Sequence, residues 1–69
     1  MGVFEMPEIV VYAVGNRTQD QKRALCKDIT DAMVKNYNVP IEAVVITLVE
    51  TPRTDKSKGG VLFSEMPAR

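Results

Sequence analysis

Two apolar runs of similar character flank one amphipathic segment. The first run covers residues 8–14 (EIVVYAV), and the second covers residues 44–50 (VVITLVE). Both are rich in β-branched side chains and show little alternation between apolar and polar positions, which is typical of strands covered on both faces. The pattern therefore predicts two buried strands over these residues.

Between the two runs, apolar side chains recur at steps of three and four residues from residue 19 to about residue 36. These positions are Leu25, Ile29, Ala32, Met33 and Tyr37. Cys26 lies one helical position past this apolar stripe. The spacing predicts an amphipathic helix of about five turns. Thr18 and Gln21 have the spacing of a capping box, while Asn38 and Pro40 are typical of a helix end.

A strand, a helix and a second strand predict an α/β fold, namely one right-handed βαβ unit with parallel strands. One helix covers only one face of a two-stranded sheet, and two strands alone are marginally stable. The opposite face and the sheet edges are nevertheless apolar. Because the sequence contains no internal repeat to cover them, we expect other copies of the chain to complete the fold.

The remaining segments are short. Residues 51–60 form a polar stretch that ends in Gly59 and Gly60, and residues 61–63 (VLF) suit a short strand or hairpin that adds to a neighbouring sheet. We expect a domain over residues 7–64, preceded by an extension or a wrongly assigned start at residues 1–6 and followed by a tail at residues 65–69.

A chain of 69 residues forms one domain at most and usually needs an added source of stability. With one cysteine and no histidine, an internal disulfide is excluded and the usual zinc-ligand patterns are absent. We predict neither a metal nor a cofactor, so oligomerisation is the remaining source of stability.

Charge and hydropathy argue against nucleic-acid and membrane partners. Nine basic and nine acidic residues cancel, so the electrostatic footprint of a nucleic-acid binder is missing. The apolar runs are far shorter than the roughly 18 residues of a membrane span, and the start lacks the features of a signal peptide. A soluble, cytoplasmic protein is expected, with no nucleic-acid or membrane partner.

Two residues that flank the first strand carry candidate chemistry. Pro7 immediately precedes the strand and Arg17 follows it in a turn. A proline at a chain terminus offers a secondary amine for proton transfer, and an arginine offers a guanidinium fork for a carboxylate. On position alone, Pro7 is also explained as a proline that begins a strand, without a catalytic role. Arg17 is likewise explained as a solvated charge on the surface.

These residues and their spacing resemble the 4-oxalocrotonate tautomerase family of the tautomerase superfamily. The resemblance is carried by Pro7, residues 15–22 (GNRTQDQK), Pro40, Gly59 and Gly60, and it runs without gaps from Pro7 to about Ser64. It implies a βαβ subunit in a hexamer, a trimer of dimers. It also implies proton transfer on 2-oxo and enol acids, with Pro7 as catalytic base and Arg17 holding a substrate carboxylate from a neighbouring subunit.

The sequence departs from the family pattern at two positions. Val45 stands where the family has a second arginine, and Lys56 stands where it has an aromatic residue. Arg53 and Lys56 are candidate substitutes for the missing arginine on charge alone. The resemblance therefore implies a small carboxylic acid substrate that need not be a dicarboxylic enol acid.

Three functions stay open. Proton transfer requires that Met6 is the true start, so that removal of Met6 exposes the amine of Pro7. If residues 1–6 are retained, Pro7 is blocked and the chain is a non-catalytic oligomer or small-ligand binder. A hydratase or dehalogenase acting on an unsaturated acid needs a carboxylate to activate water, for which Glu50 is the one nearby candidate.

Overall fold

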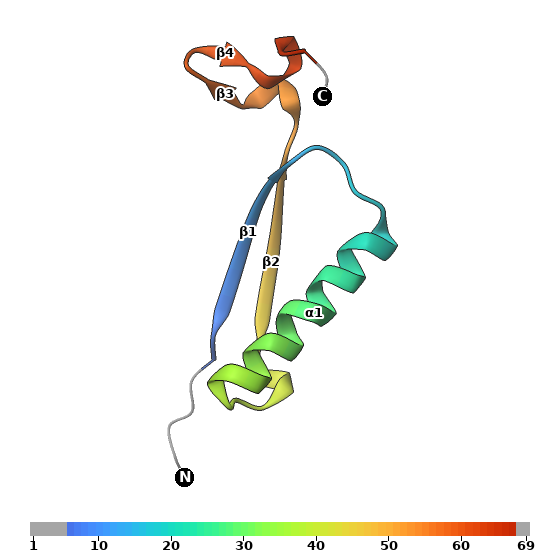
Figure 1. The fold of residues 1–69 in the computed structure, drawn as a ribbon, viewed down its shortest axis with the longest axis vertical. Helices are drawn as coiled ribbons and strands as arrows, with labels where there is room; N and C mark the ends of the chain where they lie inside the picture. The colour runs from blue at the N-terminus through green and yellow to red at the C-terminus, as the bar shows by residue number, and fades with distance from the viewer. Residues whose placement is uncertain (1–5, 68–69) are drawn as a thin grey trace.

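A computed structural model describes residues 6–67. The chain forms β1 (Glu8–Val14), α1 (Gln19–Tyr37) and β2 (Val45–Thr51), with a 3-10 turn η1 (Ile41–Ala43) before the second strand. The strands are parallel and in register from Glu8 opposite Val45 to Val14 opposite Thr51. Figure 1 shows this βαβ arrangement, which confirms the predicted fold class.

Local signals set both ends of α1. The Thr18 hydroxyl accepts a hydrogen bond from the Gln21 amide at 3.1 Å, and the Gln21 side chain accepts one from the Thr18 amide at 3.0 Å. Asn38 adopts the left-handed conformation at φ 58° and donates its amide to the Val34 carbonyl. The capping box and the C-cap are therefore confirmed, with the helix ending one residue later than predicted.

The side of α1 turned toward the sheet differs from the predicted stripe. Its half-buried positions are Lys22, Cys26, Ile29, Thr30, Met33 and Val34. Cys26 thus belongs to the covered side, in agreement with its expected structural role, although it lies outside the predicted apolar stripe. Leu25 and Tyr37 are 42% and 63% exposed. The reason is that α1 is rotated about its axis, so that its most apolar stripe does not face the sheet directly.

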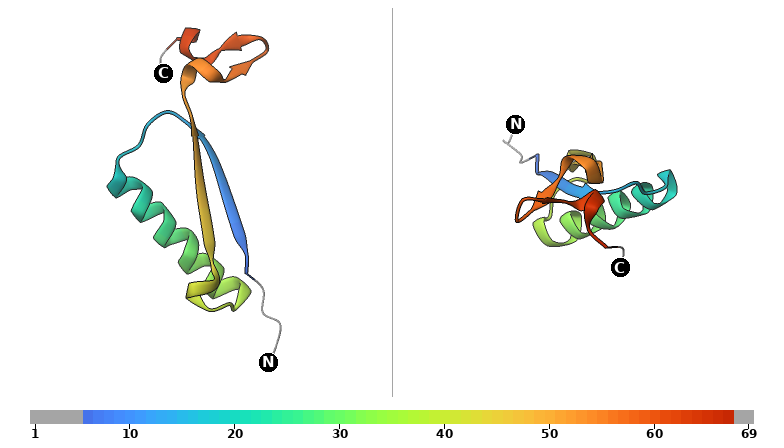
Figure 2. Two further views of the ribbon diagram at one scale, coloured as in Figure 1. Left: turned by 180° about the vertical axis from the view of Figure 1, so that it is seen from behind. Right: turned by 90° about the horizontal axis from the view of Figure 1, so that it is seen from above.

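Residues 53–65 form a small separate hairpin. It comprises the turn η2 (Arg53–Asp55), the antiparallel strands β3 (Ser57–Lys58) and β4 (Val61–Leu62), and the turn η3 (Phe63–Glu65). Gly59 and Gly60 connect the strands at φ 62° and 83°, the left-handed geometry that two-residue hairpin turns require. Figures 1 and 2 show the hairpin standing beyond the ends of β1 and β2.

The projecting hairpin makes the protomer elongated. Its radius of gyration is 16.1 Å, against about 11 Å for a compact domain of this length. Figure 2 shows α1 on one side of the two strands. Among the described residues, Ala43 is the one hydrophobic side chain that is fully buried, at 3% exposure. The βαβ unit therefore has almost no core of its own.

The sheet face turned away from α1 is uncovered and largely apolar. Val10, Tyr12 and Val45 are 41%, 71% and 40% exposed on this open face. The alternating burial along both strands places their neighbours Ile9, Val11, Ile46 and Leu48 toward α1. Exposed apolar area of this kind marks an interaction surface in a folded protein.

Candidate functional site

Pro7 lies at the start of β1, half-buried. Its carbonyl accepts a hydrogen bond from the Val45 amide at 3.0 Å, which ties it to the first residue of β2. A cavity of about 320 Å³ lined by Met6, Pro40, Glu42 and Ala43 lies at this end of the sheet. Its lining is mostly apolar and includes no cation.

Arg17 lies beyond the other end of β1, in the turn that leads into α1. Gly15 opens this turn at φ 104°, a conformation that favours glycine. The Gly15 amide donates to the Thr51 carbonyl at 3.2 Å, and the Arg17 amide donates to Glu50 Oε2 at 3.2 Å. The Arg17 side chain is exposed and its guanidinium makes no hydrogen bond or ion pair within residues 6–67.

One chain does not bring these two residues together. β1 is a continuous strand of seven residues, and a rise of about 3.3 Å per residue separates its ends by roughly 20 Å. Pro7 precedes the first residue of β1 and Arg17 follows its last, so the two lie at opposite ends of the sheet. A site that uses both residues takes them from different copies of the chain.

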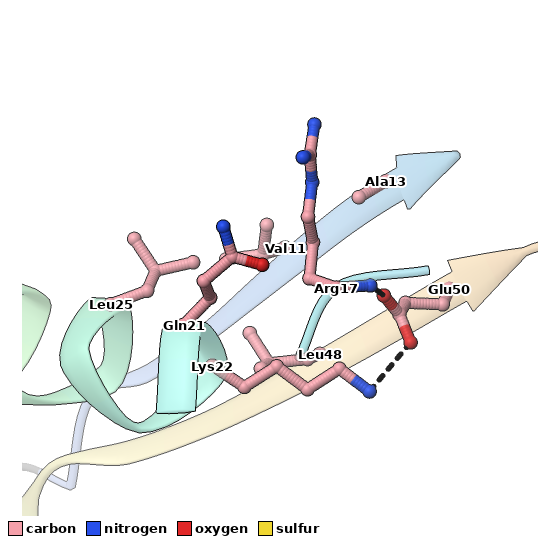
Figure 3. Close-up of a pocket in the computed structure, with 8 residues that line it drawn as sticks. All are labelled: Val11, Ala13, Arg17, Gln21, Lys22, Leu25, Leu48 and Glu50. Atoms are coloured by element: carbon pink, nitrogen blue, oxygen red, sulfur yellow. Dashed lines mark hydrogen bonds and ion pairs between the residues drawn. The ribbon is translucent and has the colours of Figure 1, made fainter. Parts of the chain in front are cut away.

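A cavity of about 230 Å³ opens between the first turns of α1 and the sheet, next to Arg17. Its apolar wall comprises Val11, Ala13, Leu25 and Leu48, and its polar rim comprises Arg17, Gln21, Lys22 and Glu50. Figure 3 shows the Arg17 guanidinium turned away from Glu50, although its backbone nitrogen is bonded to that carboxylate.

Glu50 is the best-connected charged residue at this end of the sheet. Lys22 Nζ lies 2.7 Å from Glu50 Oε1, with the two side chains 29% and 22% exposed. The hydrogen bond from Lys22 lowers the pKa of the Glu50 carboxyl, assisted by the Arg17 amide and by the positive charges of both residues against a smaller opposing effect of burial. Lys22 was not among the site residues predicted from the sequence, because its contact joins residues 28 positions apart.

Arg53 and Lys56, the candidate substitutes for the missing arginine, lie in the hairpin. Arg53 Nη2 donates to the Phe63 carbonyl at 2.6 Å, a contact that braces η2 against η3. Arg53 also lines a cavity of about 380 Å³ that includes Asn16 of the Arg17 turn. Lys56 is half-buried, and its carbonyl accepts the Phe63 amide at 2.8 Å. Neither residue lines the cavity beside Arg17, and their role in substrate binding stays a prediction.

Val45 lies next to Pro7 in the same chain, through the hydrogen bond described above. On the same open face, the Thr47 hydroxyl donates to Glu8 Oε2 at 3.2 Å. The β2 residue bonded to the Pro7 backbone is thus an aliphatic one, valine, rather than an arginine.

Residues 6–67 contain neither a metal-ligand cluster nor a helix suited to a membrane. No group of three or more cysteine, aspartate or glutamate side chains is arranged to hold a metal ion there. No helix in this part of the chain combines the length and the apolar character needed to cross a membrane.

Comparison with known proteins assigns the family. The profile described as "Tautomerase enzyme" matches residues 7–66, a range that begins at Pro7. A probable tautomerase of Bradyrhizobium diazoefficiens is 48% identical over 63 residues, covering 91% of this chain and 94% of the relative. The 2-hydroxymuconate tautomerase of Pseudomonas putida is 31% identical over 61 residues, covering 88% and 97%.

A solved structure supports the same fold. The heterohexamer 4-oxalocrotonate tautomerase from Chloroflexus aurantiacus matches with a TM-score of 0.80 at 24% identity, covering 90% of this chain and all of the other. Similar proteins thus include a hexamer. With the profile match over most of its length and the close relative from Bradyrhizobium, the chain belongs to the family of 4-oxalocrotonate tautomerase-like tautomerases.

Proposed function

We propose that this tautomerase moves a proton between carbon and oxygen, or between two carbons, of a small 2-oxo or 2-hydroxy unsaturated carboxylic acid. Pro7, as the first residue of the mature chain, is the acid and base, and Arg17 of a second copy holds the substrate carboxylate. The observation that carries the proposal is the placement of these residues at opposite ends of β1, with the uncovered open face between them.

Assembly is the first requirement. Two copies of β1 paired antiparallel about a two-fold axis set Pro7 of one chain beside the Arg17 turn of the other. That pairing covers the free edge of β1 and joins the two sheets into one, while Val10 and Tyr12 remain on the open face, where further copies would pack against them. Burial of apolar area supplies the main driving force for such association. A dimer, or a hexamer built as a trimer of dimers, is the expected assembly.

The chemistry follows from an exposed proline amine. A terminal amine titrates near about pH 8 in water, and a partly buried position beside a cation lowers its pKa, because both effects disfavour the protonated form. The neutral amine of Pro7 takes a proton from the substrate hydroxyl or carbon, and the resulting ammonium returns a proton at the other position. No cofactor is required for this exchange.

The surroundings of Pro7 favour a monocarboxylic substrate with an apolar tail. The guanidinium of Arg17 pairs with one carboxylate. Val45, whose amide is bonded to the Pro7 carbonyl, is aliphatic at the position where the family has a second arginine. The enol of phenylpyruvate meets this description better than a dicarboxylic acid such as 2-hydroxymuconate.

The direct test is activity of a protein that begins at Pro7. It is expected to convert the enol of phenylpyruvate, and Pro7→Ala is expected to lose about 10²- to 10⁴-fold in kcat/KM, the usual contribution of a positioned acid or base. Equal rates from the two proteins would defeat the proposal. Circular dichroism and the oligomeric state of the variant serve as controls for folding.

The two alternatives are separable. Intact mass of protein from its native source distinguishes a chain that starts at Pro7 from one that retains Met1 or Gly2, in which case a non-catalytic role is favoured. Hydration or dehalogenation needs a free carboxylate base, whereas both oxygens of Glu50 have partners and its pKa is lowered. The cytoplasmic location stays a prediction.

A further inference from the structure

The turn between β1 and α1 is fixed along its backbone while one of its side chains is left without a partner. The amides of Gly15, Arg17 and Thr18 donate to the Thr51 carbonyl, to Glu50 Oε2 and to Gln21 Oε1 at 3.2, 3.2 and 3.0 Å. The Arg17 guanidinium, by contrast, extends from this rigid backbone with no hydrogen bond to residues 6–67 (Figure 3).

The carboxylate that holds Arg17 is itself fully engaged. Glu50 uses Oε2 for the Arg17 amide and Oε1 for Lys22 Nζ. Each of its oxygens thus has a donor, and the donors come from the turn and from α1. The partial burial of both side chains of the ion pair, at 29% and 22% exposure, reduces the solvent screening that weakens exposed pairs.

The charge of Lys22 has a specific consequence for Arg17. A carboxylate this close to an arginine attracts the guanidinium of that arginine, and a bidentate pair would form in competition with a substrate carboxylate. Lys22 occupies the second oxygen and neutralises Glu50. The guanidinium then points away from Glu50, as Figure 3 shows.

We infer that Glu50 and Lys22 are positioning residues for substrate capture: Glu50 fixes the backbone of Arg17, and Lys22 keeps Glu50 from pairing with its guanidinium. The inference rests on the proposed function, in which Arg17 binds the substrate carboxylate. Neither residue is assigned a contact with substrate.

The kinetic test is a double-mutant cycle on protein that begins at Pro7, with the enol of phenylpyruvate as substrate. Lys22→Gln is expected to raise KM about five- to tenfold, a typical coupling between neighbouring groups, and to leave kcat within about twofold. The reason is that an unneutralised Glu50 competes with substrate for Arg17. Adding Glu50→Gln to Lys22→Gln restores KM, because the amide oxygen still accepts the Arg17 N–H but no longer attracts the guanidinium.

The same cycle in an Arg17→Ala background separates positioning from a general structural role. Without the guanidinium, Lys22→Gln is expected to have no further effect on KM. Lys27→Gln is the matched control, since it also breaks a lysine–carboxylate pair of α1, the exposed contact of Lys27 with Asp31 at 2.8 Å. Three outcomes would each overturn the inference. Lys22→Gln could lower kcat at constant KM, or it could raise KM in Arg17→Ala as much as in wild type. In the third outcome, Glu50→Gln fails to restore the KM of Lys22→Gln.

A second measurement does not depend on catalysis. The charged groups around Glu50 are Lys22 from α1, Arg17 from the turn and Arg53 from η2, which shares a cavity with it. In an NMR titration the Arg17 amide is expected to follow ionisation of Glu50, with its midpoint raised in Lys22→Gln and the transition lost in Glu50→Gln. If the chemical shift of the Arg17 amide does not follow the ionisation of Glu50, this inference is wrong. If the titration is as expected but the protein is inactive, only the proposed function is wrong.

Discussion

The Val45 amide donates a hydrogen bond to the Pro7 carbonyl at 3.0 Å, which joins the first residue of β2 to the proposed catalytic residue. Val45 also stands at the position where the 4-oxalocrotonate tautomerase family has a second arginine. Residue 45 is therefore the position at which an added charge tests whether a second cation selects the substrate.

Val45→Arg is expected to shift specificity toward dicarboxylic acids. The added guanidinium supplies a charge-assisted partner for the second carboxylate, which raises kcat/KM for 2-hydroxymuconate about tenfold or more relative to the enol of phenylpyruvate. Val45→Gln, which adds length and polarity without charge, is the control. The prediction is contradicted if Val45→Arg and Val45→Gln have the same ratio of kcat/KM for 2-hydroxymuconate to kcat/KM for the enol of phenylpyruvate.

The open face of the sheet is expected to be the assembly surface. Tyr12 is 71% exposed in the protomer, so Tyr12→Glu buries an unpaired carboxylate only if copies of the chain meet there. We expect this variant to shift toward monomer and to lose activity with it, as measured by analytical ultracentrifugation across a concentration series. Ala24→Glu on the exposed side of α1 adds the same charge and is expected to leave assembly intact.

A wild-type mass distribution that Tyr12→Glu does not change would place the interface elsewhere. A stable, well-folded wild-type monomer at working concentrations would contradict the assembly altogether. The reason is that the described part of the protomer buries little beyond Ala43, and a chain of this size needs apolar burial to offset its conformational entropy.

Glu50 is expected to make stability depend on pH in a defined direction. Its folded-state pKa lies below the ordinary value of 4.5, chiefly because of the hydrogen bond from Lys22. A carboxyl group whose pKa is lowered by folding stabilises the folded state at pH values above its ordinary pKa. This stabilisation is lost as the pH falls through the folded-state pKa. Wild type is thus expected to be more stable than Glu50→Gln near neutral pH, with the difference shrinking in acid.

Thermal unfolding at matched protein concentration, from about pH 7 to about pH 3, measures this difference across the range in which carboxyl groups titrate. Glu42→Gln is the control, since Glu42 is exposed and forms no ion pair within residues 6–67. A gap in Tm between wild type and Glu50→Gln that stays constant across the series would show that ionisation of Glu50 does not contribute.

The elements that the amino-acid sequence determined are those set by neighbours in the chain. The capping box of Thr18 and Gln21 joins residues three positions apart, and Asn38 ends α1 because it tolerates a left-handed backbone. The strand around Val11 follows from a run of β-branched side chains. Each depends on contacts within a few residues, so the order of side chains is sufficient to predict it.

The tertiary structure decided how these elements face one another. The rotation that turns Cys26 toward the sheet depends on how α1 packs, and the contacts of Lys22 with Glu50 and of Arg53 with Phe63 join residues that are distant in sequence. Local propensity carries no information about such pairs, because they form only when the strands and the helix have reached their final register. The candidate site depends on one further level of contact, since β1 holds Pro7 and Arg17 apart in every single copy.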